Sequence, residues 1–310
     1  MRIIVSGPTG AIGMALLQLC QEQDMEILAI CRKDSSRRVR LEQYKNVNVL
    51  NLDLCDYAGF QPEKQQYSYD VFFHFAWEAT SGNDRDNVTL QHKNIAYALD
   101  AVKLAKRFGC HTFVGAGSQA EFGRVEGKLT SDTPAFPESG YGMAKLCAGQ
   151  MTRLLCEQID MRHIWTRILS VYGPYDGEQT LVLGMIRKLL NGQTVDCTKG
   201  EQRWDYLYSK DAAKAMLLLA QKGKSGKVYC IGSGKSHPLQ EYIRIIKEVV
   251  NPDGEIRFGA LEYGPRQVMH LCADISELTN DTGFIPETDF TTGIRHTLEY
   301  VKRGKCNELI

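Results

Sequence analysis

The segment Tyr141-Gly142-Met143-Ala144-Lys145 places a phenol and an ammonium group four residues apart. On a helix these two side chains lie on the same face, one turn apart. A free phenol has a pKa of about 10 and is a poor base at neutral pH, but a neighbouring cation favours its phenolate form. The pair predicts that Tyr141 is an acid/base that gives its proton to a carbonyl oxygen while a hydride reaches the carbonyl carbon.

Ser118 is the expected third member of this catalytic group. It ends the run Phe113-Val114-Gly115-Ala116-Gly117-Ser118, so its hydroxyl follows a predicted strand. There it can hydrogen-bond a substrate oxygen and hold that oxygen against Tyr141. A serine in this position by itself is typical of turns. Its order along the chain, after a glycine-rich loop and before Tyr141 and Lys145, favours the catalytic role.

The glycine-rich loop Gly7-Pro8-Thr9-Gly10-Ala11-Ile12-Gly13 follows a predicted strand and opens a predicted helix. Its glycines permit a tight turn and close approach of the backbone to a pyrophosphate at the helix N-terminus. This context predicts a dinucleotide site. Loops at the carboxyl ends of parallel strands share one crevice. The predicted cofactor-binding residues are Gly7, Thr9, Gly10, Ala11, Ile12, Gly13, Arg32, Asp53, Leu54, Phe75, Ala76, Tyr141 and Lys145.

Basic residues follow the second predicted strand, where an enzyme that selects NAD usually has an acid. Arg32 and Lys33 come first, with Ser35 and Arg37 close behind. A guanidinium can stack on adenine and pair with a 2′-phosphate, whereas a carboxylate would repel that phosphate. The sequence therefore favours NADP(H), and Asp34 leaves NAD(H) possible.

Short apolar runs that alternate with amphipathic segments must position these residues. The expected strands are Arg2–Ser6, Glu26–Cys31, Val47–Leu52, Val71–Phe75, Thr112–Ala116 and His163–Leu169. Helical spacing of apolar residues separates them. Continuous apolar strands joined by helices predict an α/β fold with a parallel sheet covered by helices on both faces.

The rhythm changes after Pro174, which predicts a smaller C-terminal α/β lobe. Helices are expected around Leu181–Leu190 and Ala212–Leu219, and strands near Tyr206 and at Lys227–Ile231. We predict a cofactor domain over residues 1–172, to which residues 203–234 contribute a strand and a helix. Residues 173–202 and 235–310 form the predicted substrate-binding lobe.

Composition narrows the class of protein. The 310 residues include 37 basic and 37 acidic side chains, so the net charge of zero argues against a nucleic-acid binder with a broad cationic face. The cluster Arg37-Arg38-Val39-Arg40 could form a small anion site. Ten scattered cysteines contain no CxxC pair, which favours free thiols in a reducing compartment over a disulfide scaffold or a metal site.

No apolar run is long enough to span a membrane, and Ala215–Ala220 is among the longest. The first strand begins near Ile3, which leaves no room before it for a signal peptide. We therefore expect a cytoplasmic protein with no membrane or nucleic-acid partner and no metal.

These motifs together resemble the extended short-chain dehydrogenases/reductases, also called NAD-dependent epimerases/dehydratases, along essentially the whole chain. The glycine loop, Ser118, Tyr141 and Lys145 match the family signature. Its later landmarks are matched by Tyr172-Gly173-Pro174, Asp205, Asp211 and Ile231-Gly232-Ser233-Gly234. The resemblance implies a Rossmann-type fold and a homodimer formed through helices near Asn94–Phe108 and Tyr141–Glu157.

The strings Tyr175-Asp176-Gly177-Glu178, Gly200-Glu201-Gln202 and Phe258-Gly259-Ala260-Leu261-Glu262 are most similar to NDP-hexose 4-ketoreductases of the CDP-abequose and CDP-paratose synthase type. This resemblance implies that NADPH reduces the 4-keto group of a nucleotide-linked 4-keto-6-deoxy sugar. Sugar 4,6-dehydratases have an Asp-Glu pair after the catalytic hydroxyl, where this chain has Gln119 and Ala120, so dehydration is not expected.

The arginines that hold the nucleotide diphosphate in the family are displaced here. Where the family often has an arginine directly before the aspartate, this chain has Trp204 before Asp205, and Arg203 stands one residue earlier. On a strand, a shift of one residue turns the arginine side chain to the opposite face. At another position where the family has an arginine, this chain has Gly264, and Arg266 follows two residues later. The predicted substrate-binding residues are Trp77, Gln119, Arg203 and Arg266.

Other functions remain open at this point. An NDP-sugar epimerase would oxidise and re-reduce its substrate with a retained NAD, and Arg32 argues against it. A non-catalytic NADP-sensing protein could use the same fold, but such proteins commonly lose the Tyr–Lys pair that Tyr141 and Lys145 keep. A reductase of carbonyl compounds other than sugars is the third alternative.

Overall fold

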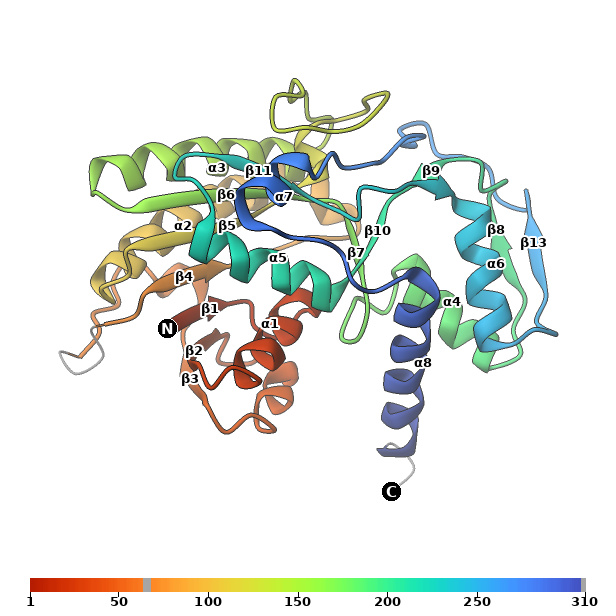
Figure 1. Cartoon of the computed structure of the whole chain (residues 1–310), viewed down its shortest axis with the longest axis horizontal. Helices are drawn as coiled ribbons and strands as arrows, with labels where there is room; N and C mark the ends of the chain where they lie inside the picture. The colour runs from red at the N-terminus through yellow and green to blue at the C-terminus, as the bar shows by residue number, and fades with distance from the viewer. Residues whose placement is uncertain (64–67, 308–310) are drawn as a thin grey trace.

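A seven-stranded, entirely parallel sheet forms the centre of the computed structural model, which describes residues 1–63 and 68–307, with side chains to residue 304. The strand order is β11-β6-β5-β4-β1-β2-β3 (Figure 1). Its strands are β1 (Arg2–Ser6), β2 (Glu26–Cys31), β3 (Val47–Asn51), β4 (Val71–His74), β5 (Thr112–Ser118), β6 (Arg162–Ile168) and β11 (Val228–Ile231). This order places the loops after β1, β4 and β5 side by side at one edge, where the crevice of such sheets lies.

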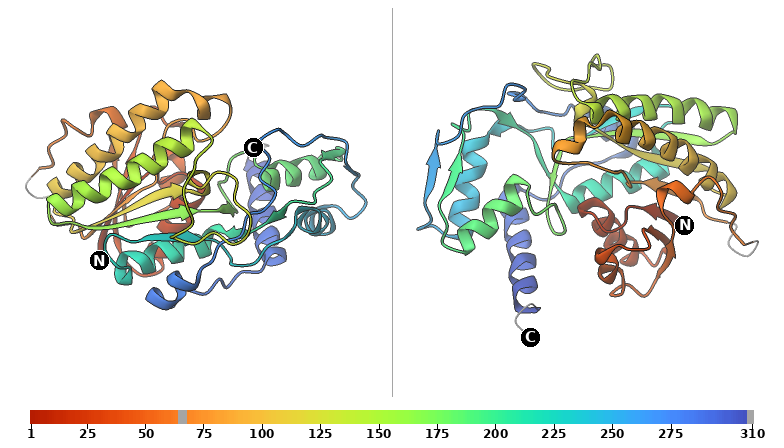
Figure 2. Two further views of the ribbon diagram at one scale, coloured as in Figure 1. Left: turned by 90° about the horizontal axis from the view of Figure 1, so that it is seen from above. Right: turned by 180° about the vertical axis from the view of Figure 1, so that it is seen from behind.

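Helices cover both faces of the sheet, and Figure 2 shows the three layers. One face packs against α1 (Ala11–Gln21), α5 (Ser209–Lys222) and α7 (Ser276–Thr282). The other face packs against α2 (Val88–Arg107) and α3 (Gly140–Gln158). The α/β fold with a Rossmann-type parallel sheet is confirmed, because apolar strands buried on both sides need such a cover.

All six strands expected before Pro174 are present; two have the predicted bounds, and the ends of the other four differ from the prediction by one or two residues. The largest difference is at β5, which continues past Ala116 to Ser118. Gly115 and Gly117 make this possible, because a Cβ at Gly115 would be 2.3 Å from the Trp165 ring and one at Gly117 would be 2.3 Å from the Glu121 carboxylate. Side chains of β6 and of the loop after β5 therefore fill the space that larger residues would need.

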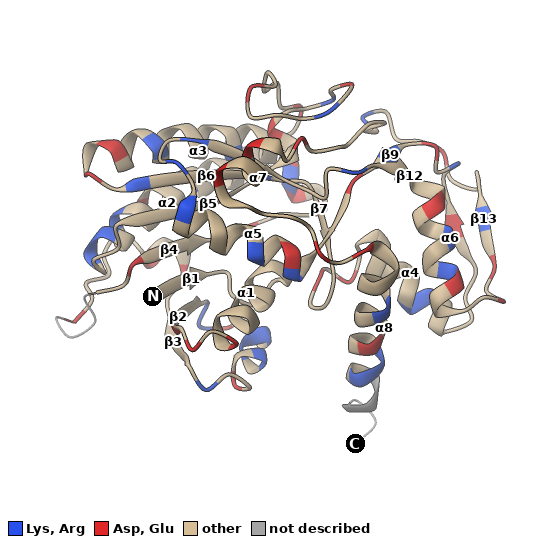
Figure 3. Cartoon of the chain, viewed as in Figure 1, with Lys and Arg blue, Asp and Glu red and all other residues tan. Residues whose placement is uncertain are grey.

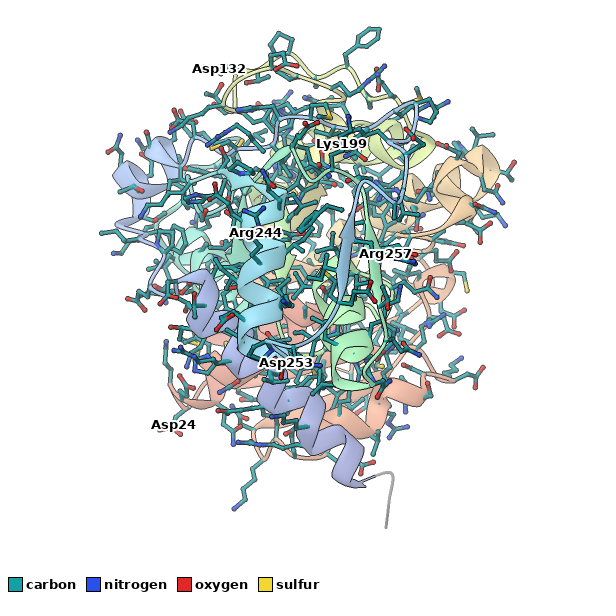
Figure 4. All side chains as sticks on the ribbon, turned by 90° about the vertical axis from the view of Figure 1, so that its right-hand side faces the viewer. Asp24, Asp132, Lys199, Arg244, Asp253 and Arg257 are labelled. Carbon is teal, nitrogen blue, oxygen red and sulfur yellow. The ribbon has the colours of Figure 1, made fainter. Side chains whose placement is uncertain are left out.

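A smaller lobe stands beside the sheet and has its own apolar core. It contains α4 (Leu181–Leu190), α6 (Leu239–Val250) and α8 (Phe290–Asn307), with the parallel pair β8 (Val195–Cys197) and β13 (Ile256–Phe258). Arg244 on α6 and Arg257 on β13 lie on the outer side of this lobe (Figure 4). The Arg257 Nε donates to the Asp196 carboxylate across the strand pair at 2.6 Å. A smaller lobe was expected, and the division at residues 172, 203 and 234 stays a prediction.

Short strand pairs join the lobe to the sheet. β7 (Ser170–Tyr172) pairs with β10 (Tyr206–Tyr208), and β9 (Arg203–Trp204) pairs with β12 (His237–Pro238). The buried Asp205 carboxylate accepts hydrogen bonds from the backbone N–H groups of Ser233, Gly234 and Ala273. One carboxylate therefore joins its own segment to two others that are distant in the sequence.

The charged side chains are spread over the surface, and the cysteines of the described residues are unpaired. Both signs of charge are interspersed along the helices in Figure 3. Nine cysteines are free within the described residues, and the side chain of Cys306 lies outside the description. Among the residues placed by the structure, no helix is long and apolar enough to cross a bilayer, and no cluster of three or more His, Cys, Asp or Glu could bind a metal.

Candidate active site

The glycine loop between β1 and α1 is shaped by close backbone contacts. Gly7 has a φ of +71°, and a Cβ there would lie 2.7 Å from the Ala76 nitrogen. A Cβ at Gly13 would lie 2.6 Å from the Pro8 carbonyl oxygen. Gly10 is the N-cap of α1 and faces open space, with no atom within 4 Å of an added Cβ. The loop therefore brings a bare backbone and a helix N-terminus to the crevice, as pyrophosphate binding requires.

Two separate cavities lie near Tyr141, whose ring contacts Trp77 in the wall of one and Arg85 in the wall of the other. The larger one, about 540 Å³, is the cofactor cleft, and it runs from the glycine loop past the ends of β2, β3 and β4. Of the predicted cofactor residues, it is lined by Gly7, Thr9, Gly10, Arg32, Leu54, Phe75 and Ala76. The walls fit a dinucleotide, because glycines would face a pyrophosphate and apolar side chains would face a base.

The other predicted cofactor residues do not line this cleft, namely Ala11, Ile12, Gly13, Asp53, Tyr141 and Lys145. Ala11 faces a different cavity, between α1 and the lobe. Ile12 packs against the core beneath the sheet, and Gly13 lies against Pro8. The Asp53 carboxylate accepts a hydrogen bond from the Lys33 backbone N–H at 3.1 Å. Asp53 therefore holds the turn after β2 in place.

The end of β2 presents basic and hydroxyl groups to the cofactor cleft. Arg32, Ser35 and Arg37 all line it. Asp34 is exposed and is absent from the lining of the cleft. Arg40 turns from the same segment toward the glycine loop, where its Nη1 donates to the Thr9 carbonyl at 3.0 Å. This part of the cleft therefore carries basic and hydroxyl groups.

Ser118 and Tyr141 meet at the end of β5. Tyr141 lies in the first turn of α3, which Ser139 caps by accepting a hydrogen bond from the Gly142 N–H at 3.1 Å. Burial raises the pKa of the Tyr141 phenol, while a hydrogen bond with Ser118 and the charge of Arg85 oppose that rise. The helix therefore starts where Tyr141 can reach the hydroxyl that follows the sheet.

Lys145 lies one turn further along α3 and is buried. Its Nζ donates to the Ala116 carbonyl at 2.5 Å and stands 3.7 Å from the centre of the Trp77 ring. The same nitrogen is 5.8 Å from the centre of the Tyr141 ring. Burial lowers the pKa of Lys145 to about 7, and the charge of Glu121 opposes this. The structure therefore brings together all three residues that the sequence assigned to catalysis.

A buried ion pair supports this site from behind. Glu121 and Arg167 are 1% and 4% exposed, and the Arg167 Nε donates to the carboxylate at 2.9 Å. The Trp165 indole and the Ser118 backbone N–H also donate to Glu121. Burial raises the pKa of the Glu121 carboxyl, and Arg167 is the largest opposing cause. Glu121 therefore fixes the backbone of Ser118.

The four residues predicted to bind substrate lie in different places. Trp77 lines the cofactor cleft, and its indole donates to Gln91 at 2.9 Å. Gln119 and Arg266 line the second cavity, of about 280 Å³. Arg266 also pairs with Asp86 at 3.4 Å. Arg203 is exposed on β9 and binds the carbonyl oxygen of Ser236.

Sequence reasoning missed Arg85, which lies against the other side of Tyr141. Its Cζ is 4.5 Å from the centre of the Tyr141 ring, and its side chain lines the second cavity. Arg85 belongs to the 3-10 turn Asn83–Asp86 after β4, where nothing in the local pattern marks a functional residue. Tyr141 thus contacts Trp77 of the cofactor cleft and Arg85 of the second cavity, so it lies between the two.

Known proteins resemble this chain in sequence. The model of the NAD dependent epimerase/dehydratase family matches residues 3–232. A CDP-abequose synthase of Salmonella muenchen is 23% identical over 305 residues, covering 96% of this chain and 97% of the relative. A dTDP-glucose 4,6-dehydratase of Escherichia coli is 23% identical and covers 98% of this chain and 94% of its own.

Solved structures have the same fold. A UDP-glucose 4-epimerase of Thermotoga maritima superposes with a TM-score of 0.88 at 22% identity, covering 98% of this chain and 100% of that one. A UDP-N-acetylglucosamine 4-epimerase of Methanobrevibacter ruminantium M1 gives a TM-score of 0.87 at 24% identity, with 98% of both chains covered. The sequence match, which spans most of the chain, identifies it as an enzyme of the NAD dependent epimerase/dehydratase family.

Proposed function

We propose that the protein uses NADPH to reduce the 4-keto group of a nucleotide-linked 4-keto-6-deoxy sugar. The observation that carries this proposal is the position of the Tyr141 ring against Trp77 of the cofactor cleft and Arg85 of the second cavity, with the Ser118 hydroxyl near enough to lower the pKa of the phenol. A proton donor between a dinucleotide and a carbonyl substrate is what ketone reduction needs.

In the proposed reaction the Ser118 hydroxyl holds the carbonyl oxygen beside the Tyr141 phenol. The nicotinamide cofactor, when bound, supplies the hydride to the carbonyl carbon. Tyr141 gives its proton to the oxygen as negative charge develops there, which turns the ketone into an alcohol and leaves a phenolate. Lys145 has an ammonium group with three donors, one of which is used by Ala116, so two remain for the cofactor side of the site.

The residues after Ser118 argue against dehydration of a sugar. Removing water from a sugar needs a general acid and a general base near C5 and C6. Gln119 and Ala120 stand at those positions and cannot exchange protons at neutral pH. The nearest carboxyl is Glu121, which is buried and bonded to Arg167. The relative named dTDP-glucose 4,6-dehydratase therefore supports a nucleotide-linked sugar as the substrate of this protein, but it does not support dehydration as the reaction.

Preference for NADPH is supported by the three side chains at the end of β2. Arg32, Ser35 and Arg37 could bind a 2′-phosphate through charge and hydrogen bonds. Several solved structures of similar fold, which are between 18% and 20% identical to this chain, carry NAD in their names. The proposal therefore predicts that this protein prefers a different cofactor from those proteins, because of the side chains that follow β2.

The substrate class is supported by the names of the relatives. CDP-abequose synthase, dTDP-glucose 4,6-dehydratase and UDP-sugar 4-epimerases all act on sugars carried by a nucleotide. The second candidate function is an NDP-sugar epimerase with a retained NAD, which the two epimerase structures favour. It differs from a reductase in one measurable way, because an epimerase leaves the total amount of reduced cofactor unchanged.

The test mixes the purified protein with NADPH or NADH and a panel of NDP-4-keto-6-deoxyhexoses, and follows the absorbance of the reduced cofactor. We expect consumption with at least one sugar, and Tyr141→Phe should lower the rate by about a hundredfold or more, since a positioned acid contributes that much. Arg32→Ala should weaken NADPH binding far more than NADH binding, by roughly tenfold for one lost charge-assisted contact.

Several outcomes would contradict this proposal. Tyr141→Phe turning over at the normal rate would remove Tyr141 as the acid. Equal losses for both cofactors in Arg32→Ala would remove the argument for phosphate selectivity. Interconversion of NDP-sugars without net oxidation of NADPH, by protein that retains NAD through purification, would replace the reductase with the epimerase.

Two further expectations belong to this proposal. The homodimer predicted through α2 and α3 is supported by exposed apolar side chains on α3, namely Met143, Met151 and Leu154. Light scattering of the purified protein would measure the mass directly. A cytoplasmic location also stays a prediction.

A further inference from the structure

The 3-10 turn Asn83–Asp86 is anchored to the first turn of α3, beside Tyr141. The Asp86 carboxylate accepts a hydrogen bond from the Gly140 N–H at 2.9 Å. A Cβ at Gly140 would lie 3.1 Å from the Arg85 carbonyl oxygen, so glycine lets the two segments meet. The Gln91 side chain donates to the Asp84 carbonyl at 3.2 Å. These contacts place the backbone of Arg85 at a fixed position next to the catalytic helix.

The Arg85 side chain is half-buried and has no acceptor of its own. Its guanidinium carbon stands 4.5 Å from the centre of the Tyr141 ring. Within residues 1–63 and 68–304 no hydrogen bond or ion pair of its guanidinium is found. The other arginines of the second cavity are neutralised, since Arg124 pairs with Glu138 at 2.8 Å and Arg266 with Asp86 at 3.4 Å.

All charged groups around Tyr141 can be compared. Arg85 approaches from the turn after β4, Lys145 from α3 itself and Glu121 from the turn after β5. Lys145 is further from the ring, at 5.8 Å, and lies closest to the Trp77 ring and the Ala116 carbonyl. The walls of the second cavity add Asp86, Arg124, Glu138 and Arg266, which form the two ion pairs described above.

We propose that Arg85 is a positioning residue that sets the acid strength of Tyr141, because its guanidinium, held against the ring, favours the phenolate form. A guanidinium stays protonated at every physiological pH, whereas burial lowers the pKa of Lys145 to about 7. Arg85 therefore gives Tyr141 a permanent cation. The direction of its influence on the pKa of Tyr141, downward, agrees with this geometry.

This inference rests on the proposed role of Tyr141 as the proton donor, but it can be tested without any substrate. Protein labelled with 3,5-difluorotyrosine, whose phenol is more acidic than that of tyrosine, is titrated by fluorine NMR in the absence of cofactor. The resonance of residue 141 is identified by its absence in Tyr141→Phe. In Arg85→Gln we expect the phenolate fraction at a given pH to fall by roughly tenfold, the effect of losing one nearby cation.

Two variants decide whether charge is the cause. Arg85→Lys keeps a cation and should titrate close to the wild type. Arg124→Gln removes an arginine of the same cavity that is paired with Glu138, and should leave the titration of residue 141 unchanged. The proposal is overturned if Arg85→Gln titrates like the wild type, if Arg85→Lys titrates like Arg85→Gln, or if Arg124→Gln shifts the curve as far as Arg85→Gln.

The pH profile of turnover separates this inference from the proposed function. Loss of Arg85 makes the phenol a weaker acid, so the high-pH limb of ketone reduction, which needs the protonated phenol, should move to higher pH. A shifted NMR titration in a protein that reduces no sugar would leave the inference standing and refute the function. Normal sugar reduction with an unshifted titration would do the reverse.

Discussion

Two charged side chains are buried next to the end of β5, and their surroundings differ. The Glu121 carboxylate receives hydrogen bonds from Arg167, Trp165 and the Ser118 backbone. The Lys145 ammonium has one acceptor in the described structure, the Ala116 carbonyl, and otherwise faces the Trp77 ring. One charge is thus fully bonded and the other is left with unused donors.

This difference indicates that Glu121 has a structural role, whereas Lys145 is available to bind a ligand. A buried ion pair whose lone pairs are all bonded is rigid and holds the Ser118 backbone, but it has no proton to exchange with a ligand. A buried ammonium with one acceptor is costly to fold around, which is why its pKa falls to about 7. The cost is tolerated at an active site because the free donors are available to bound ligands.

The largest expected effect comes from breaking the Glu121–Arg167 ion pair. Glu121→Gln leaves the Arg167 guanidinium buried without its counter-charge and should lower the free energy of unfolding by about 3–5 kcal/mol. Arg167→Met should cost less, because the Glu121 carboxyl that remains can take up a proton whereas a guanidinium cannot lose one. Denaturant unfolding at pH 8 and pH 5.5 measures both.

The direction with pH is part of this prediction. In Arg167→Met the folded protein holds a proton on Glu121 that the unfolded chain has released at pH 8, so the penalty should shrink as the pH falls toward 5.5. Glu22→Gln, which removes an exposed partner of Lys210, is the matched control and should change stability by less than about 1 kcal/mol. A pH-independent penalty in Arg167→Met would show that the carboxylate stays charged.

A smaller change in stability, of opposite sign, is expected when Lys145 is replaced. Lys145→Met removes the poorly bonded charge, so it should abolish ketone reduction and yet raise the melting temperature by roughly 5 °C at pH 7. Differential scanning calorimetry measures the second effect. Lys302→Met, on the exposed surface of α8, should leave the melting temperature unchanged.

The pH dependence follows from the lowered pKa of Lys145. The unfolded chain keeps this proton up to about 10.5, while the folded protein loses it near 7. Between these values the unfolded state binds more protons, so this group's contribution to wild-type stability rises with pH. The advantage of Lys145→Met should therefore be largest at pH 7 and below and should decrease toward pH 10. An advantage that grows with pH would refute the assignment.

The smallest effect concerns the ring beside the ammonium. Trp77→Leu removes the aromatic face 3.7 Å from the Lys145 nitrogen and should slow reduction by about fivefold, since such a contact contributes about 1 kcal/mol. Trp77→Phe loses the hydrogen bond to Gln91 but keeps a ring, and should retain most of the rate. Equal rates in the two variants would assign the effect to Gln91 and not to the ring.

Sequence reasoning grouped the predicted catalytic residues better than the predicted substrate residues. Ser118, Tyr141 and Lys145 depend on a short run and on the order of elements, which a linear pattern records. Arg203 and Arg266 depend on how the lobe sits against the sheet, and the structure has them bonded to Ser236 and Asp86. The β9 and β12 strands are two residues each and leave no alternating pattern to recognise.

The sequence by itself determined the parallel sheet, the glycine loop and the spacing of Tyr141 and Lys145. Those features arise from periodicity and from residues close together in the chain, where sterics and helix geometry act directly. Only the tertiary structure decided that Arg85 faces the tyrosine ring and that Arg167 neutralises Glu121. Charges interact through space across distant segments, so the partner of a buried charge is known only when the chain has folded.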